Sequence, residues 1–408
     1  MSPAAMPLRW LAGIFAVSAV YAWLVVIVSS DSVHRTWGEM AACGYAIAFI
    51  VLLAWKGRGR DVALGVSLIG GLLAPLSWMI SKGLEQPEVA VVARSGAMLI
   101  HHGTPYASTA ALATTTNPNA YNPYLPVMAL FGVPRALADS AFTDPRIWFG
   151  LAFVCVFWLA LRRAGAKDPL RWTVLVTGCP VIAFTLATGG DDVPIVAFLC
   201  LGLAFLWGQP SPVLAGLALG VAAAMKATTW PALAVVLALL AARDGKRAAV
   251  RFILTAVAVV VVTAGPFLIH PGPLIENTIR FPLGLANVIS AAASPLPGHL
   301  IADTGHTGHT IVVVLLVLAG LAVAGLLVFR PPRTVPRATL VLVVAMTLMF
   351  LLAPSTRYGY FIYPMALLIW LLAAVAARQS NEVTRDPGEP PANSCTNRRT
   401  SSARPPAA

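Results

Sequence analysis

Charged side chains at the ends of long apolar segments are the first candidates for chemistry in this 408-residue sequence. Glu88 follows the third apolar segment, and Asp191 and Asp192 lie between two later segments in the run ATGGDDVP. Lys226 in AAAMKATTWP and Arg357 in STRYGYFIYP each interrupt apolar surroundings. A charge near hydrocarbon is costly unless it is paired or has a function, so these positions suggest a binding or catalytic site.

These residue types suit a substrate that carries an anionic phosphate. Lys226 and Arg357 could pair with the phosphate, and Tyr358 adds an aromatic ring directly after Arg357. A carboxylate could then accept a proton from a second substrate. His101 and His102, in the run HHGTPY, are further candidates for contact with a substrate.

Each candidate also has a simpler structural explanation. Glu88 could stabilise the start of an interfacial helix. Asp191 and Asp192 could cap the next helix, or they could contact acceptor hydroxyls or a divalent ion. Lys226 could extend to lipid headgroups, and Arg357 could anchor the chain in the aromatic belt of the membrane. The histidines could be hydrated residues of the interface. No H-E-x-x-H motif or paired cysteine spacing is present, so the sequence predicts no cofactor and gives no support for a metal.

The elements that must position these residues are membrane helices. Hydrophobic residues make up 58% of the chain and charged residues only 11%, which excludes an ordinary soluble enzyme. The sequence therefore predicts an all-α polytopic membrane protein with about 12 transmembrane helices. The apolar segments lie at about 8–29, 38–56, 62–83, 146–164, 170–189, 192–208, 211–227, 230–243, 248–270, 310–330, 337–353 and 359–378. The three between 192 and 243 could instead be two long helices or kinked halves, because Pro194, Pro210, Pro212 and Pro231 interrupt them.

The distribution of basic residues predicts the orientation of the chain. With both termini in the cytoplasm, the inner side contains 20 of the 28 Lys and Arg residues and the outer side contains 8. This topology leaves two long outer loops, at about 84–145 and 271–309, and places every candidate residue on the outer side. The apolar stretch from Tyr124 to Ala138 is too short to span and contains two prolines, so we expect a re-entrant or interfacial segment.

Four runs occur in an order that is typical of one enzyme family. An acid at Glu88 precedes the GTPY of HHGTPY by about 14 residues, and NAYNPYLPVMALFGVP follows. GLALGVAAAMKATTWPAL and STRYGYFIYP come later in the chain. In this order the runs resemble polytopic glycosyltransferases of the GT-C superfamily. The nearest subgroup is the actinobacterial alpha-mannosyltransferases that use polyprenyl-phosphate-mannose.

The resemblance implies a function and a role for one residue. Glu88 would be the general base that deprotonates an acceptor hydroxyl, whose oxygen attacks the anomeric carbon of the sugar with inversion while polyprenyl phosphate leaves. The family usually has Asp at this position, and Val92 stands where a Tyr is common. The implied partners are a lipid-linked sugar donor, with mannose as the sugar, and a lipid or glycan acceptor, without nucleic acid, at the outer face of the plasma membrane.

The same resemblance divides the chain into three parts. Residues 1–61 would form two added transmembrane helices, 62–378 the GT-C-like catalytic core, and 379–408 a disordered cytoplasmic tail rich in Pro, Ser, Asn and Arg. Two alternatives remain. A transporter or flippase for a lipid-linked sugar would have two similar halves, and no clear internal repeat is present. A catalytically silent relative that binds polyprenyl lipids would account for the departures at Glu88 and Val92.

Overall fold

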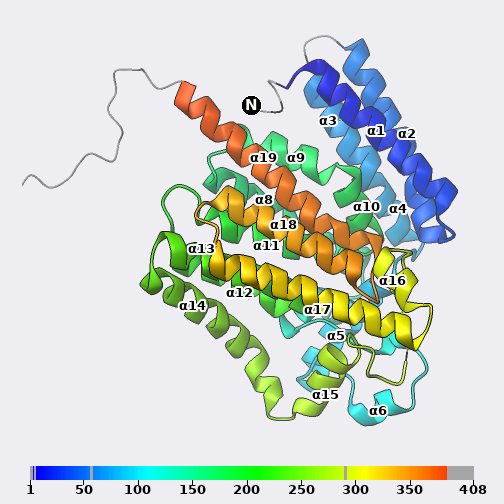
Figure 1. Ribbon diagram of the computed structural model, residues 1–408. Coiled ribbons are helices and arrows are strands. Elements are labelled where there is room, and N and C mark those ends of the chain that lie inside the picture. The colour runs from blue at the N-terminus through cyan, green and yellow to red at the C-terminus, as the bar shows by residue number, and fades with distance from the viewer. Residues whose placement is uncertain (1–2, 4–5, 56–57, 289–291, 384–408) are drawn as a thin grey trace, which may run out of the picture.

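The protein is helical throughout the part that the structure describes. The computed structural model describes residues 3, 6–55, 58–288 and 292–383 (Figure 1). These residues form no named strand, and their one β-bridge joins Ala293 and Thr356. The structure confirms the prediction of an all-α polytopic membrane protein.

Eight helical segments of the described residues are long and apolar enough to cross a bilayer, and a bent pair would make nine. The remaining three expected segments are helices of 13 or 14 residues, short for about 30 Å of hydrocarbon. The count of twelve therefore stays a prediction. The eight segments are Leu8–Val28 (α1), Ser32–Ala54 (α2), Gly59–Ser81 (α3 to α4), Pro145–Arg163 (α8), Lys246–Leu268 (α14 to η7), His306–Phe329 (α17), Val335–Leu352 (α18) and Tyr358–Ala377 (η9 and most of α19).

The bent pair has a clear cause in the sequence. Helices α9 (Pro169–Thr177) and α10 (Pro180–Thr188) meet at 61°. Pro180 cannot donate a backbone hydrogen bond, and it disfavours helical geometry at the residue before it. The expected segment 170–189 is thus two short helices rather than one straight span.

The third span contains a π-helical turn where it meets α2. The turn, Ile69–Leu73, lies between α3 (Gly59–Leu68) and α4 (Ala74–Ser81). A Cβ atom added to Gly70 would lie 2.4 Å from the Cα of Gly44 on α2, so glycine is needed at this contact. The Trp37 indole donates a hydrogen bond of 2.9 Å to the carbonyl of Gly71. The N-terminal hairpin is therefore fastened to the rest of the bundle.

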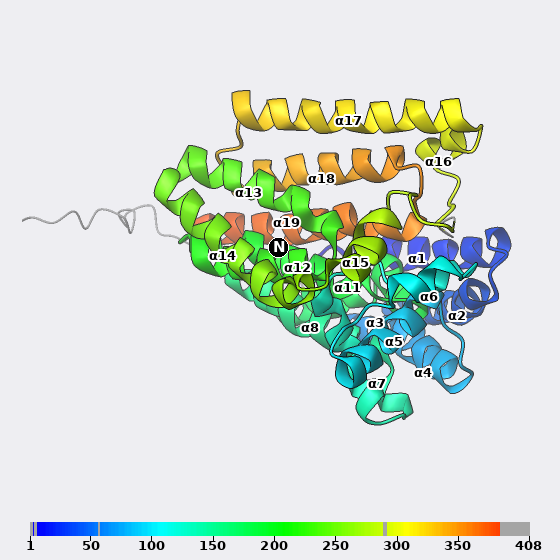
Figure 2. The same cartoon turned by 90° about the horizontal axis from the view of Figure 1, so that it is seen from below.

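Helix α11 (Asp192–Ala204) is the centre of the bundle. Each of its residues except Phe198 is buried, and it packs against α8, α12 (Pro212–Met225) and α19 (Ile362–Val383). Figure 2 shows α19, α18 and α17 as successive layers, with α17 outermost. Because α11 is surrounded by other helices, polar residues at its start must find partners within the protein.

The two long loops predicted to face outside lie at the same end of the molecule. They contain α5 (Pro87–His102), α6 (Thr109–Ala113), α7 (Val133–Leu137), α15 (Pro271–Ile275) and α16 (Pro297–Ala302) (Figure 1). Side-chain contacts join the loops: Oδ1 of the Asn277 side chain accepts a hydrogen bond of 2.8 Å from the backbone N–H of Asn122, and the rings of Tyr121 and Phe281 stack with their centres 4.6 Å apart. The expected interfacial segment is a 3₁₀-helix, Pro126–Gly132, continued by α7.

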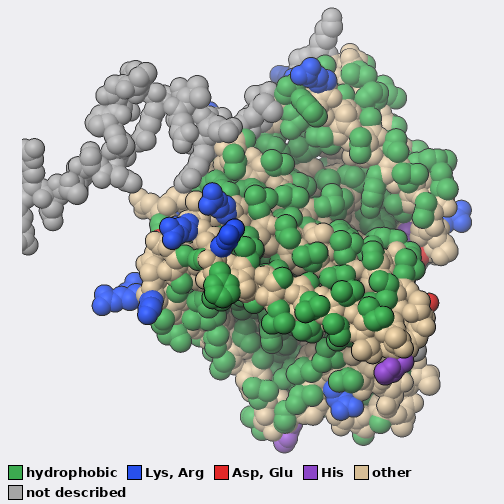
Figure 3. All heavy atoms as spheres, viewed as in Figure 1, with side chains coloured by type: hydrophobic (Ala, Val, Ile, Leu, Met, Phe, Trp, Pro, Cys, Tyr) green, Lys and Arg blue, Asp and Glu red, His purple; other side chains and the backbone are tan. Residues whose placement is uncertain are grey.

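Basic side chains gather at the opposite end. On the face shown in Figure 3, most Lys and Arg lie where the connections α13–α14 and α17–α18 emerge, and the rest of that face is largely hydrophobic. Helix α13 is Trp230–Arg243. The exposed basic residues of these connections include Lys246, Arg247, Arg330, Arg333 and Arg337. This separation agrees with the charge pattern of the sequence, while the side of the membrane on which each end lies stays a prediction.

The ends of the expected domains can be compared only in part. Helix α19 continues to Val383, five residues into the tail that was expected to begin at 379. Residues 384–408 lie outside the described part of the chain. The boundary at 61 falls within α3, so the third span begins slightly earlier than predicted.

Candidate active site

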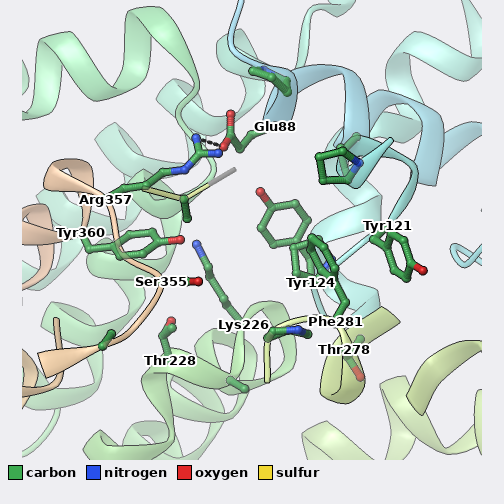
Figure 4. A pocket seen from close by; sticks show the side chains of 18 of the residues that line it. Glu88, Tyr121, Tyr124, Lys226, Thr228, Thr278, Phe281, Ser355, Arg357 and Tyr360 are labelled. Carbon is green, nitrogen blue, oxygen red and sulfur yellow. Dashed lines mark ion pairs between the residues drawn. The ribbon is translucent and has the colours of Figure 1, made fainter. Parts of the chain in front are cut away.

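A cavity of about 280 Å³ lies between the first predicted outer loop (84–145) and the ends of the bundle helices. Glu88, Lys226 and Arg357 all line it, although they are far apart in the sequence (Figure 4). The structure therefore brings together three of the predicted site residues. Other side chains of the cavity wall are Tyr121, Tyr124, Thr228, Phe281, Phe350 and Tyr360.

Lys226 is held by the two aspartates that start α11. Its Nζ lies 3.1 Å from Asp191 Oδ2 and 2.7 Å from Asp192 Oδ1. The Tyr363 hydroxyl donates a further hydrogen bond of 2.6 Å to Asp192 Oδ1 and lies 3.3 Å from the Thr228 hydroxyl. The side chains of Lys226, Asp191 and Asp192 are only 10%, 9% and 6% exposed. A single cation thus balances two buried carboxylates.

The local backbone explains how Lys226 reaches this position. Helix α12 ends at Met225, and Lys226 has extended dihedral angles (φ −156°, ψ 132°) before a 3₁₀ turn over Ala227–Thr229. The Met225 carbonyl accepts a hydrogen bond of 2.9 Å from the backbone of Leu125, which ties the break to the first outer loop. Pro231, at the start of α13, is compatible with a helix restarting after this break.

Aromatic rings form the walls around the ammonium group. Lys226 Nζ lies 4.9 Å from the centre of the Tyr360 ring and 5.4 Å from that of Tyr124, within the range of cation–π attraction. In Figure 4 the Tyr124 and Tyr360 hydroxyls and the Lys226 ammonium point toward the same central space. The Tyr121 hydroxyl points away from it and donates instead to the Leu112 carbonyl.

Glu88 lies in the first turn of α5, where it forms an ion pair with Arg357 (Figure 4). One carboxylate oxygen contacts the guanidinium, and the other, Oε2, is buried without a hydrogen-bond partner. Burial raises the pKa of Glu88, and Asp191 adds to this effect, while Arg357 and Lys226 partly oppose it. A carboxylate with a raised pKa and one oxygen without a partner is suited to accept a proton.

The segment before Glu88 is fixed to the connection between α10 and α11. The backbone of Gln86 donates a hydrogen bond of 2.9 Å to the Thr188 carbonyl. Arg146, which is fully buried, donates to the carbonyls of Leu84 and Ala187, each at 2.9 Å. Its other guanidinium nitrogens bind Asp144. Arg146 therefore links the segment that carries Glu88 to the segment that carries the two aspartates.

Helix α5 also makes a close backbone contact with the 3₁₀-helix Pro126–Gly132. A Cβ added to Gly96 would lie 2.2 Å from the carbonyl carbon of Gly132, and one added to Gly132 would lie 2.0 Å from the Val92 carbonyl oxygen. Only glycine allows α5 and the 3₁₀-helix Pro126–Gly132 to approach this closely. Val92, at the position where a tyrosine was expected, is fully buried in this interface.

Three predicted site residues lie away from the cavity. Tyr358 is 57% exposed, and its backbone donates a hydrogen bond of 3.1 Å to the Ser294 hydroxyl. His101 and His102 are exposed at the end of α5 and do not line the cavity. The 3₁₀ turn at Tyr358–Phe361 directs Tyr360, rather than Tyr358, toward Lys226.

The structure also distinguishes between the alternatives for the aspartates. Asp191 occupies the N-cap position of α11, but its side chain makes no capping hydrogen bond. Both aspartates bind Lys226 instead. Among the described residues, no group of three or more His, Cys, Asp or Glu side chains is arranged to hold a metal ion.

Four contributors to the site are not among the residues predicted for it. Tyr360 and Tyr363 belong to the tyrosine cluster next to Arg357, Tyr124 begins the expected interfacial segment, and Arg146 has no predicted role. An arginine next to Asp144 at the start of an apolar helix was a usable signal, because such a charge must be paired when buried. The tyrosines gave no signal beyond their clustering.

The fold and the cavity define a polytopic membrane protein with an acid and two cations in a pocket at one end. Residues 122–354, more than half of the chain, match the model of glycosyltransferase family 87. The chain therefore belongs to glycosyltransferase family 87. The matched region includes Asp191, Asp192 and Lys226, whereas Glu88 and Arg357 lie outside it.

One solved structure is similar over much of the chain. It is the crystal structure of ArnT from Cupriavidus metallidurans in the apo state, with 17% sequence identity and a TM-score of 0.46. The alignment covers 82% of this chain and 60% of that protein, so the chain spans less than two thirds of its length. The comparison with curated proteins gave no match.

Proposed function

We propose that the protein transfers a sugar, with mannose as the first candidate, from a polyprenyl-phosphate carrier to a lipid or glycan acceptor. The reaction would take place at the outer face of the plasma membrane. The observation that carries the proposal is the pairing of Glu88 with Arg357 in a cavity where the second oxygen of Glu88 has no partner. The proposed reaction removes a proton from the acceptor and releases a phosphate, so it needs a carboxylate base beside a cation.

In the proposed reaction, Glu88 accepts the proton of an acceptor hydroxyl group. The hydroxyl oxygen forms a bond to the anomeric carbon, and the bond from that carbon to the phosphate oxygen breaks. The electron pair of the broken bond leaves with polyprenyl phosphate, and the configuration at the anomeric carbon inverts. Glu88 later returns its proton to water.

The contacts of the two cations support different roles for them. Lys226 and Arg357 were both predicted to hold the donor phosphate. Lys226 is already neutralised by Asp191 and Asp192, whereas Arg357 has a single acidic partner. We therefore assign the phosphate to Arg357, and we assign to Lys226 the role of holding the start of α11 against the end of α12.

The first two helices are proposed as an addition that supports this site. His34 on α2 accepts a hydrogen bond of 2.6 Å from the Gln86 amide, two residues before Glu88. Its other ring nitrogen lies 3.0 Å from the Ser29 hydroxyl. The catalytic core would then be residues 62–378, with the N-terminal hairpin holding the segment that leads into α5.

The test is product analysis with purified protein, polyprenyl-phosphate-mannose and a pool of lipid and glycan acceptors. Replacing a general base typically lowers the rate by about 10²–10⁴-fold, so Glu88→Gln should lose turnover to that extent. Glu85→Gln is the matched control, three residues earlier on the same segment. Its carboxylate lies 3.9 Å from Arg146 and does not line the cavity, and Arg146 keeps its closer contacts in the variant, so activity should remain near wild-type. If Glu88→Gln turned over normally while Asp191→Asn or Asp192→Asn was inactive, the base would lie at the start of α11 instead.

A further inference from the structure

We propose that Arg357 exchanges its partner during the reaction. It holds the Glu88 carboxylate before the donor binds, and it moves to the donor phosphate when the lipid-linked sugar enters the cavity. The exchange releases Glu88 to act as the base. This inference rests on the proposed function, because it concerns the donor and the base of the same site.

The charges around the cavity make an exchange necessary. Arg357 and Lys226 are paired with three carboxylates, those of Glu88, Asp191 and Asp192. A phosphate that entered this cluster would add a further negative charge without a free cation to receive it. Since an unpaired charge in a partly desolvated site is costly, the phosphate must displace one of the carboxylates from its cation.

The surroundings of the two cations decide which pair opens. Lys226 and its aspartates are at most 10% exposed, and Tyr363 adds a hydrogen bond to Asp192. The side chains of Arg357 and Glu88 are 29% and 16% exposed, so water and a ligand can reach them more easily. Breaking the Arg357 pair leaves Glu88 facing the cavity, whereas breaking the Lys226 pairs would leave buried aspartates. The Arg357 pair is therefore the one that exchanges.

Release from Arg357 also makes Glu88 a better base. The guanidinium favours the ionised carboxylate and so weakens its tendency to accept a proton. Once the guanidinium contacts the phosphate, both oxygens of Glu88 can face an acceptor hydroxyl. The base is thus held less reactive until the donor has bound, which disfavours reaction steps in the wrong order.

The movement of charge during the reaction favours the same exchange. When Glu88 takes the acceptor proton, it loses its negative charge and no longer competes for the guanidinium. At the same time the phosphate gains negative charge, because it leaves with the electron pair of the broken bond. The attraction between Arg357 and the phosphate is therefore strongest at the point where the leaving group needs it.

Binding of a free polyprenyl phosphate to the full chain in lipid nanodiscs tests the exchange without turnover. An uncharged polyprenol of the same length is the comparison ligand. Glu88→Gln removes the competing carboxylate and should tighten binding of the phosphate by about ten-fold, whereas Arg357→Gln should weaken it by about ten-fold. The double variant should bind no more tightly than Arg357→Gln alone, because the gain needs the guanidinium. Polyprenol binding should be the same in all variants.

The control variant removes the acidic partner of an arginine that lies outside the cavity. Arg135 and Asp139 form an exposed ion pair of 2.8 Å in the first outer loop, and Asp139→Asn should leave phosphate affinity unchanged. Glu88→Asp shortens the acid by one methylene and loosens the pair, so its affinity should lie between those of wild type and Glu88→Gln. This second variant decides the question if Glu88→Gln does not fold.

The outcomes separate the exchange from the proposed function. Unchanged or weaker binding of polyprenyl phosphate in Glu88→Gln and Glu88→Asp would overturn the exchange. The proposed donor would still stand in that case, provided that the wild-type protein binds polyprenyl phosphate better than polyprenol. If the wild-type protein and all variants bound polyprenyl phosphate no better than polyprenol, the proposed donor itself would be overturned. An equal gain of affinity in Asp139→Asn would show a general effect of charge and would also overturn the exchange.

Discussion

The two basic residues of the cavity differ in how completely their charges are matched. Lys226 contacts two carboxylates and two aromatic rings, and a tyrosine hydroxyl completes the hydrogen bonds of one carboxylate. Arg357 contacts a single carboxylate, Glu88, whose second oxygen lacks a partner. We call Lys226 with its two aspartates the closed cluster, and Glu88 with Arg357, which line the cavity, the open pair.

This difference indicates what each cluster contributes. A fully paired buried cluster has nothing to gain from a ligand, but it fixes the helices that supply its members, in this protein α11 and α12. A pair with an unpartnered oxygen at a cavity can exchange contacts at lower cost. A basic residue at the outer end of a membrane helix is therefore not by itself a phosphate site, because its existing partners decide whether its charge is available.

The largest effect on stability is expected at the closed cluster. Lys226→Met leaves Asp191 and Asp192 buried without their cation, and removing one partner from a buried ion pair typically costs about 3–5 kcal/mol. The measurement is the shift in thermal unfolding of the purified protein in detergent. Asp191→Asn and Asp192→Asn added to Lys226→Met should recover much of the loss. If Lys226→Met unfolded like wild type while losing donor affinity, Lys226 rather than Arg357 would be the residue that holds the phosphate.

A smaller loss is expected when the closed cluster keeps its charges. Tyr363→Phe removes only the hydroxyl that donates to Asp192, and hydrogen bonds to charged groups contribute about 1.5–3 kcal/mol. Unfolding should therefore shift less than in Lys226→Met. Tyr358→Phe is the matched control, since the Tyr358 ring is exposed and should tolerate the change. Equal shifts in Tyr363→Phe and Tyr358→Phe would argue against the closed cluster as a source of stability.

Much of the fold could be predicted from the sequence, because hydropathy reports directly which segments lie in the membrane. The prolines between 192 and 243 also indicated that the segments around α11 could be short. The bend between α9 and α10 was not predicted, because hydropathy alone does not show where a span is broken. Glu88 and Arg357 were identified one by one, but their pairing was not. They are separated by most of the chain, and their contact depends on where the first turn of α5 lies relative to the connection between α18 and α19.

The closed cluster shows the same limit more sharply. Asp191 and Asp192 were predicted to cap a helix or contact a ligand, and Lys226 to bind phosphate, because each was considered within its own segment. Their contact arises from the packing of α11 against α12, which periodicity does not determine. Tyr358 was chosen over Tyr360 for its position next to Arg357, and the 3₁₀ turn at the start of α19 decides between them.

The open pair should determine how turnover depends on pH. Glu88 must be ionised to accept a proton, so activity should be lost as pH falls through its pKa, which burial raises above the usual value. Arg357 opposes this rise, and Arg357→Gln should therefore move the acidic limb of the kcat/KM profile to higher pH. Asp191 and Lys226, which also act on this pKa, are unchanged in the variant. A shift to lower pH, or no shift, would mean that another group is the base.

The smallest effect should come from the N-terminal hairpin, which contacts the segment before Glu88 through the Gln86 side chain. In His34→Ala the Gln86 amide loses its acceptor, while the Gln86 backbone stays bound to Thr188. We therefore expect kcat to fall by less than about ten-fold, within the range of one hydrogen bond, with no change in affinity for polyprenyl phosphate. His34→Gln offers another acceptor and should recover part of the rate. A loss of donor affinity in His34→Ala would mean that the hairpin positions Arg357 as well as Glu88, and the separation between the hairpin and the catalytic core would then fail.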